Sequence, residues 1–384
     1  MTDTDRLERG RRAYSDIMTA PAPQDVSPAT VHLLDFVFAE VWQRPGLTRR
    51  ERRFVTLPCV AAADADQPLR DHVYAALNSG DISIVEMRET VLHFAVYAGW
   101  PKASLFNMVV DEQWDRIHRD RGLPVPAAEP LLPLTTPSDP EARVAGGEQA
   151  FKEINCLEYA PPRDNPYHGA GILNFVFGEM WLRPGLGMKE RRLITVACVA
   201  FQDAAYPIMS HVYAALKSRE ISFGEMDELA LHFAAHYGWP KGSHLNQVIA
   251  EQKQRVAQEW ADEAALNAHF ATMHMATFMG AMGDCGISAT DALDDLLVRI
   301  DAPGLSLVTL ALKVSQRTGA PLADLLSEAS SMVGERIELK RRLDVKTSQA
   351  RMSAHMVAAM PAGMCAVLAL LSADFRRGLA TPAG

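Results

Sequence analysis

The segment RPGLTRRERRFVTL at residues 44–57 returns almost unchanged as RPGLGMKERRLITV at residues 183–196. The offset between the two segments is 139 residues, and it stays constant over residues 36–113 of the first copy. More than half of the aligned positions in that span are identical. Chance does not produce a match of this length, so the chain contains an internal duplication.

Each copy carries the sequence pattern of α-helices. In EMRETVLHFAVYAGW, at residues 86–100, apolar residues recur at helical spacing. Capping boxes, in which Ser or Thr precedes Glu by three positions, predict helix starts at Thr48, Ser83 and Ser222. We therefore expect an all-α protein in which each copy is a unit of about five or six helices.

Repeat limits and proline content predict four regions. Upstream of the constant offset, GRRAYSDIMTAPAP at residues 10–23 resembles GEQAFKEINCLEYAPP at residues 147–162. Proline disfavours helix and suits a tether between the copies. The predicted regions are a first repeat at 6–120, a Pro-rich linker at 121–142, a second repeat at 143–257 and a C-terminal helical region at 258–384.

Composition argues against several classes of function. The net charge is -9 and no long Lys/Arg run exists, so nucleic acid is not expected as a partner. The five cysteines are scattered without a CxxC or zinc-type spacing, which indicates reduced thiols and a cytoplasmic location. The charged N-terminus is not a secretory signal. No Gly-rich phosphate loop is present, and we expect neither a metal nor a cofactor.

Histidines recur at two pairs of equivalent positions. His72 and His211 follow loops that interrupt two helices, which is a common place for a concave site, so we predict them as catalytic acid–base groups. His93 and His232 lie in LHFA segments. These two are better explained as core histidines whose ring nitrogens are satisfied by hydrogen bonds.

Glu51 and Glu190 form a pair of equivalent carboxylates with two alternative roles. Either they cap the helix that follows RPGL, or they face the catalytic histidine and assist proton transfer. In the second alternative, burial beside FVTLPCV would raise the pKa of Glu51 toward neutrality.

The predicted substrate-binding residues are Arg44, Arg183, Trp42 and Trp181. An arginine at this position can hold a substrate carboxylate with two hydrogen bonds, or form a structural ion pair with a nearby acid. The tryptophans are also typical core or interface anchors.

The combination W-x-RPGL-x(3)-ER, H-x(2)-AAL and LHFA-x(3)-GWPK resembles the carboxymuconolactone decarboxylase family, whose superfamily includes alkyl hydroperoxidase D. The resemblance covers roughly residues 10–120 and 147–257. It implies all-helical units that pack as intertwined dimers, often assembled into hexamers. Two copies in one chain would then form a pseudo-dimer, and the chain a homo-oligomer such as a trimer of pseudo-dimers.

The hydroperoxidase branch has a CxxC motif before the histidine, but here those positions are Ala65 and Pro68 in one copy and Ala204 and Pro207 in the other. Thiol peroxidase chemistry is therefore not expected, and a peroxiredoxin-like activity would follow from the family label only. The chain looks closer to the thiol-free decarboxylase branch.

That resemblance implies a lyase acting on a small carboxylated or lactone substrate. The histidines would protonate a carbanion or dienolate after loss of carbon dioxide, with the glutamates as helpers and the arginines as carboxylate contacts. Tyr97 stands opposite His236, and Gln67 opposite Tyr206, so the two sites need not be equivalent.

The last third resembles a different family. SQRTGAPLADLLSEAS at residues 315–330 and ERIELKRRLDVKTSQARMSA at residues 335–354 look like the cytoplasmic helical half of platform proteins of type II secretion and tight-adherence pilus systems. The apolar run at 356–371 is shorter than a bilayer span of roughly 20 residues, so it is either a membrane contact at the inner membrane or a buried helix. This resemblance implies the alternative of a non-catalytic assembly protein.

Overall fold

The computed structural model describes residues 3–25, 27–124, 127 and 131–271. Residues 1–266 form one compact unit, and residues 267–384 are grouped separately. Within the described ranges the chain forms helices and loops, and no strand. The secretion-platform resemblance and the apolar run at 356–371 lie outside the described residues.

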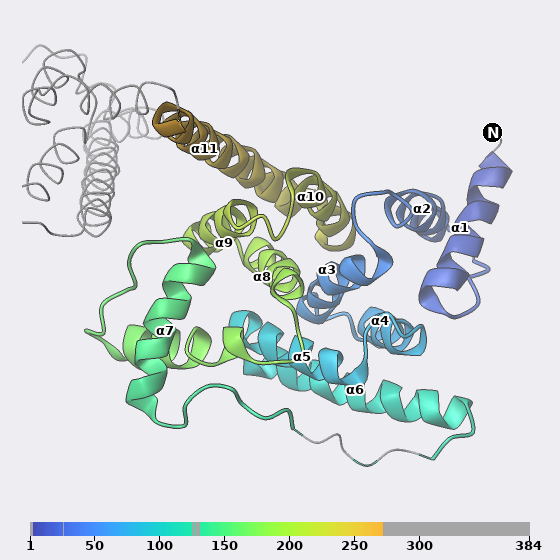
Figure 1. The fold of residues 1–384 in the computed structure, drawn as a ribbon. Helices are drawn as coiled ribbons and strands as arrows, with labels where there is room; N and C mark the ends of the chain where they lie inside the picture. Colours follow the sequence, from blue (N-terminus) through green and yellow to red (C-terminus); the bar gives the residue numbers. More distant parts are fainter. Residues whose placement is uncertain (1–2, 26, 125–126, 128–130, 272–384) are drawn as a thin grey trace, which may run out of the picture. The chain divides into compact units, whose positions relative to one another are not determined.

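The first repeat is built from seven helical segments (Figure 1). They are α1 (Asp3–Met18), α2 (Pro28–His32), the π-helical η1 (Leu33–Val41), α3 (Arg49–Ala62), α4 (Asp66–Asn78), α5 (Ile84–Ala98) and α6 (Trp100–Asp120).

The second repeat follows the same order. Its segments are α7 (Pro140–Asn155), the π-helical η2 (Tyr167–Val176), the 3₁₀ turn η3 (Met180–Leu182), α8 (Met188–Gln202), α9 (Ala205–Lys217), α10 (Phe223–Tyr237) and α11 (Trp239–Ala271). The tight turn after η3 places Gly185 at φ +95°, and its counterpart Gly46 has φ +102°. Such a backbone conformation favours glycine.

The three predicted capping boxes are present. The side chains of Thr48, Ser83 and Ser222 each accept a hydrogen bond from the backbone N–H three residues later, and the glutamate at that position bonds back. Gly187 replaces the threonine before α8, so that helix begins without a side-chain cap.

Two buried glycines show that the duplication extends upstream. A Cβ added at Gly10 would lie 2.3 Å from the carbonyl oxygen of Leu34, and one added at Gly147 would lie 1.7 Å from that of Leu173. In each repeat the absence of a side chain lets the first helix approach the π-helical segment closely, α1 on η1 and α7 on η2.

The two repeats share one hydrophobic core. α3 and α8 lie side by side at its centre, and each also packs against a helix of the other repeat, α10 on α3 and α5 on α8 (Figure 1). Buried apolar residues from both repeats belong to a single cluster. The prediction of tandem all-α repeats that form a pseudo-dimer is confirmed.

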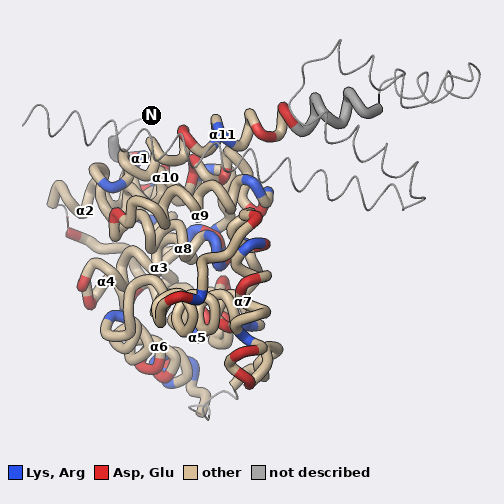
Figure 2. Tube along the Cα trace, turned by 90° about the vertical axis from the view of Figure 1, so that its left-hand side faces the viewer, with Lys and Arg blue, Asp and Glu red and all other residues tan. Residues whose placement is uncertain are grey.

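The surface of this unit mixes both signs of charge. Basic and acidic residues are interspersed along the helices in Figure 2. Among the described residues, no helix is long and apolar enough to cross a membrane.

Candidate functional site

The first histidine centre combines residues of both repeats. Trp42, which directly follows η1, stacks on His72 of α4, with ring centroids 6.3 Å apart and planes inclined by 10°. From the other repeat, α10 contributes His232 and His236. The indole Nε1 of Trp42 donates a hydrogen bond to Nε2 of His236 at 3.2 Å.

The second centre repeats this arrangement with the repeats exchanged. Trp181 stacks on His211 of α9, with centroids 5.9 Å apart and an angle of 11°. Helix α5 of the first repeat contributes His93 and Tyr97. Nε1 of Trp181 donates to the Tyr97 hydroxyl at 2.9 Å, and that hydroxyl lies 3.5 Å from Nε2 of His211. The two centres are thus related by the pseudo-symmetry of the chain.

The predicted catalytic histidines are almost fully buried. His72 is 8% exposed and His211 is 6% exposed, and Nδ1 of each has no hydrogen-bond partner. Burial, followed by the neighbouring His236 and Arg53, holds the pKa of His72 well below its ordinary value. Burial and the charge of Arg192 lower the pKa of His211 to about 3. Both imidazoles are therefore neutral at neutral pH.

His93 and His232 are buried and hydrogen-bonded through both ring nitrogens, as predicted for core histidines. Each faces an arginine through Nδ1 and a threonine through Nε2. The partners of His232 are Arg52 at 3.4 Å and Thr56 at 2.7 Å, and those of His93 are Arg191 at 3.2 Å and Thr195 at 2.9 Å. His232 of the second repeat lies against Trp42 in the first centre, and His93 of the first repeat lies against Trp181 in the second centre.

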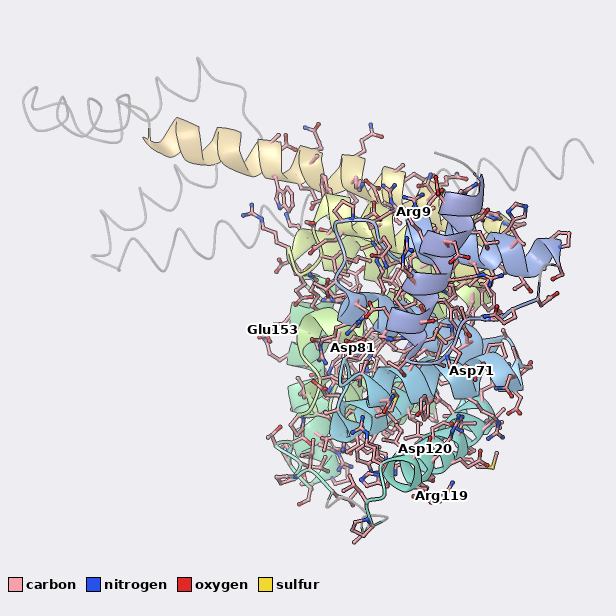
Figure 3. The ribbon with its side chains drawn as sticks, turned by 90° about the vertical axis from the view of Figure 1, so that its right-hand side faces the viewer. Arg9, Asp71, Asp81, Arg119, Asp120 and Glu153 are labelled. Carbon is pink, nitrogen blue, oxygen red and sulfur yellow. The ribbon has the colours of Figure 1, made fainter. Side chains whose placement is uncertain are left out.

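Two buried arginines beside the centres escaped the sequence prediction. The guanidinium of Arg53 lies 5.3 Å from the centre of the Trp42 ring, and that of Arg192 lies 5.0 Å from the Trp181 ring. Arg53 donates to the carboxylate of Asp81, which Figure 3 labels. Nη1 of both arginines is buried and has no partner. The signal in the sequence is the ERR motif, which both copies carry directly before an apolar stretch.

The structure does not pair Glu51 with His72. The Glu51 carboxylate accepts hydrogen bonds from the backbone N–H and the hydroxyl of Thr48. It also forms an ion pair with Lys189, whose Nζ is 2.5 Å away. Burial alone would raise the pKa of Glu51, but the bonds from Lys189 and Thr48 hold it below its ordinary value. The expected upward shift is therefore wrong, because these donors outweigh burial. Glu190 faces Arg50 at 3.4 Å.

The predicted substrate arginines are held by acids of the opposite repeat. Arg44 donates to Glu228 through Nε, which is shared between both carboxylate oxygens, and through Nη2, and Arg183 donates two hydrogen bonds to Glu89. This is the structural ion pair that was the alternative for these positions. Any role of Arg44 and Arg183 in substrate binding stays a prediction.

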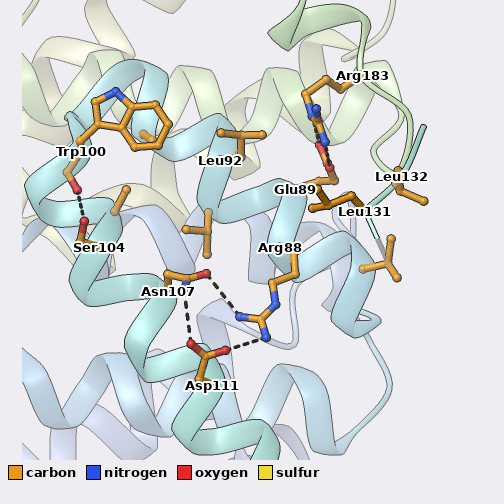
Figure 4. A pocket seen from close by; sticks show the side chains of 14 residues that line it. Arg88, Glu89, Leu92, Trp100, Ser104, Asn107, Asp111, Leu131, Leu132 and Arg183 are labelled. Carbon is orange, nitrogen blue, oxygen red and sulfur yellow. Dashed lines mark hydrogen bonds and ion pairs between the residues drawn. The ribbon is translucent and has the colours of Figure 1, made fainter. Parts of the chain in front are cut away.

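A pocket of about 600 Å³ opens between α5, α6 and the linker, with Arg183 at its edge (Figure 4). Its polar groups are bonded to one another. Arg88 pairs with Asp111 at 2.6 Å and Asn107 at 3.3 Å, and Arg183 pairs with Glu89. Because its charged groups are already paired, we place the candidate site at the histidine centres and not in this pocket.

The two fully buried thiols and the acids offer no second site within the described residues. Cys59 and Cys198 are fully buried, and burial raises the pKa of both thiols, which leaves them unreactive. In the described part of the chain, no three His, Cys, Asp or Glu side chains gather as a metal site would require.

Comparison with known proteins agrees with the duplication. Residues 30–111 and 166–251 each match the model of the carboxymuconolactone decarboxylase family. Over 88 residues the chain is 34% identical to 4-carboxymuconolactone decarboxylase of Acinetobacter baylyi, covering 23% of this chain and 62% of that protein. Over 74 residues it is 39% identical to nitrosuccinic acid decarboxylase npaB of Metarhizium robertsii, covering 19% of this chain and 51% of that protein.

These matches bear on the repeats and leave the C-terminal region unaddressed. The chain spans between half and two thirds of the length of these two curated relatives. The model of the carboxymuconolactone decarboxylase family thus matches a segment of each repeat, and each matched segment contains the Trp–His pair of one centre.

Proposed function

We propose that the chain is a carboxymuconolactone decarboxylase-like lyase that removes carbon dioxide from a small carboxylated substrate without using thiols. The observation that carries the proposal is the repeated centre, in which a buried histidine stacks on a tryptophan and keeps Nδ1 without a partner. An unpartnered polar atom in a buried place is costly, so its presence in both repeats favours a role in binding or proton transfer.

The acid–base groups of this proposal are His72 and His211. In the empty centre each imidazole is neutral, because burial disfavours its charged form. A bound carboxylate favours the imidazolium, since an opposite charge at close range raises a histidine pKa. Substrate binding would thus be accompanied by uptake of a proton.

The reaction then needs one proton transfer. The bond between the substrate carbon and its carboxylate breaks, carbon dioxide leaves, and the electron pair stays on the carbon as a carbanion or dienolate. The imidazolium gives its proton to that carbon and returns to the neutral form. Glu51 belongs to the capping box of α3 and Glu190 faces Arg50, so neither carboxylate takes a direct part in this step of the proposal.

The proposal is tested by measuring release of carbon dioxide from two substrates. These are 4-carboxymuconolactone and nitrosuccinate, which the names of the relatives suggest. We expect the double variant His72→Ala with His211→Ala to lose at least about a hundredfold in kcat/KM, the size of a general acid–base contribution. Its helical circular dichroism should be unchanged. The matched control is His168→Ala, a partly exposed residue of η2 that ion-pairs with Asp164 and belongs to neither centre. Turnover by the double variant equal to that of the unaltered chain would refute the proposal.

A further inference from the structure

The two centres differ at one position that faces the catalytic histidine. Tyr97 on α5 and His236 on α10 are equivalent by the offset of 139 residues. Each accepts the indole N–H of the tryptophan in its centre. The directions of the surrounding hydrogen bonds show that this single difference changes what the histidine can offer a ligand.

In the second centre the bonds run in one direction. Arginine can only donate, so His93 accepts from Arg191 through Nδ1 and carries its hydrogen on Nε2. That hydrogen goes to the Thr195 hydroxyl at 2.9 Å. Burial raises the pKa of the neighbouring Tyr97 phenol, and its contacts with Thr195 and Trp181 oppose that shift.

Tyr97 ends this chain of bonds at His211. Its oxygen accepts from Nε1 of Trp181, so its own hydrogen is available to Nε2 of His211, 3.5 Å away. When Tyr97 donates in this way, the neutral His211 of the empty centre carries its hydrogen on Nδ1. That Nδ1–H is buried and has no acceptor.

Arg192 supplies a second donor of the same kind. Nε of Arg192 donates to Glu220 at 2.6 Å and Nη2 to the carbonyl of Ile154, while Nη1 is buried without a partner. The guanidinium and the His211 imidazole both lie against the ring of Trp181. Two buried N–H donors beside one aromatic ring suit an anion with two acceptor oxygens.

The first centre lacks the same fixed arrangement. His236 accepts from Trp42 through Nε2, so it carries its hydrogen on Nδ1 and donates it to the backbone carbonyl of His232 at 2.8 Å. Both nitrogens of His236 are thereby occupied. His236 therefore has no hydrogen to donate to His72, so it does not fix the tautomer of His72 as Tyr97 does for His211.

We infer that the second centre is a carboxylate-binding site in which Nδ1–H of His211 and Nη1–H of Arg192 hold the carboxylate oxygens, and that Tyr97 makes it the preferred site by fixing the His211 tautomer. This inference rests on the proposed function for the identity of the ligand as a small carboxylic acid. Arg192 is thus assigned as a binding residue and Tyr97 as a positioning residue.

Titration of the full chain with succinate, followed by calorimetry, tests the site without requiring turnover. Arg192→Gln removes a charged hydrogen bond and should weaken binding by at least about tenfold. Arg53→Gln, the equivalent change in the first centre, should alter it by less than about twofold. Tyr97→Phe should weaken binding by about fivefold, the value of one neutral hydrogen bond. His236→Phe, the equivalent change in the first centre, should alter binding by less than about twofold.

The imidazole ¹⁵N spectrum gives a readout that a merely structural role of Tyr97 would not move. The signal lost in His211→Asn should report an Nδ1–H tautomer in the unaltered chain and a mixture of tautomers in Tyr97→Phe. Unchanged tautomer and affinity in Tyr97→Phe would overturn the positioning role, and equal affinity loss in Arg53→Gln and Arg192→Gln would overturn the preference. Succinate binding with this pattern, without decarboxylation of any substrate, would contradict the proposed function alone.

Discussion

At the residue scale, neighbouring glycines in α7 have opposite surroundings. Gly147 faces the backbone of η2 so closely that an added Cβ would meet the Leu173 carbonyl oxygen at 1.7 Å. An added Cβ at Gly146 meets nothing within 4 Å. The contact, and not the helix propensity, decides which of the two must be glycine.

We expect Gly147→Ala to destabilise the fold by about 3 kcal/mol or more, because η2 must move away from α7. Gly146→Ala should stabilise it by about 0.5–1 kcal/mol through better helix propensity. Urea denaturation followed by circular dichroism measures both. Equal free energies of unfolding for the two variants would mean that the close approach of α7 and η2 is absent.

At the element scale, ion pairs connect the loops before α3 and α8 to helices of the opposite repeat. The side chains of Arg183 and Glu89 are 12% and 7% exposed, whereas Arg44 is 48% exposed beside Glu228. Glu228 is also paired with buried Arg52 at 3.3 Å. Glu89 therefore depends on Arg183 for its ion pair, whereas Glu228 keeps a second arginine partner if Arg44 is removed.

Arg183→Gln leaves the Glu89 charge buried without its bidentate partner, and we expect it to cost about 3 kcal/mol of stability. Arg44→Gln leaves Glu228 paired with Arg52, and should cost less than about 1 kcal/mol. Thermal unfolding of the two variants side by side checks the ranking. A larger loss in Arg44→Gln would contradict the burial assigned to these pairs.

At the scale of the whole molecule, the centres concentrate buried histidines. Burial is the first cause that lowers the pKa of each of His72, His93, His211, His232 and His236. For His211 the pKa falls to about 3, and for His236 to about 4. In the unfolded chain their pKa returns to about 6.5, so the unfolded state binds more protons below that pH.

The free energy of unfolding should therefore fall as the pH is lowered from about 6.5 to about 5.5, by up to ~1.4 kcal/mol per pH unit for each buried histidine. Carboxylates stay ionised in both states over this window, so the histidines dominate. Urea midpoints measured across it provide the check. His236→Tyr, which gives the first centre the residue of the second, should reduce the slope. A midpoint independent of pH over this range would show that the imidazoles titrate freely in the folded chain.

The sequence by itself determined the duplication, the helices and their capping boxes. These follow from local spacing, such as Thr48 three residues before Glu51, and from apolar periodicity, both of which are written in neighbouring residues. It also identified His72 and His211 as a repeated pair, because the copies could be aligned directly.

Only the tertiary structure decided what surrounds those histidines. Tyr97 and His236 reach the centres from the opposite repeat, more than a hundred residues away along the chain from the histidine or tryptophan that they contact. The partner of Glu51 likewise comes from across the repeat interface, at Lys189. Such contacts depend on how α5 packs on α8 and α10 on α3. Burial and hydrogen-bond direction, which set the protonation of an imidazole, arise from that packing and have no local pattern in the sequence.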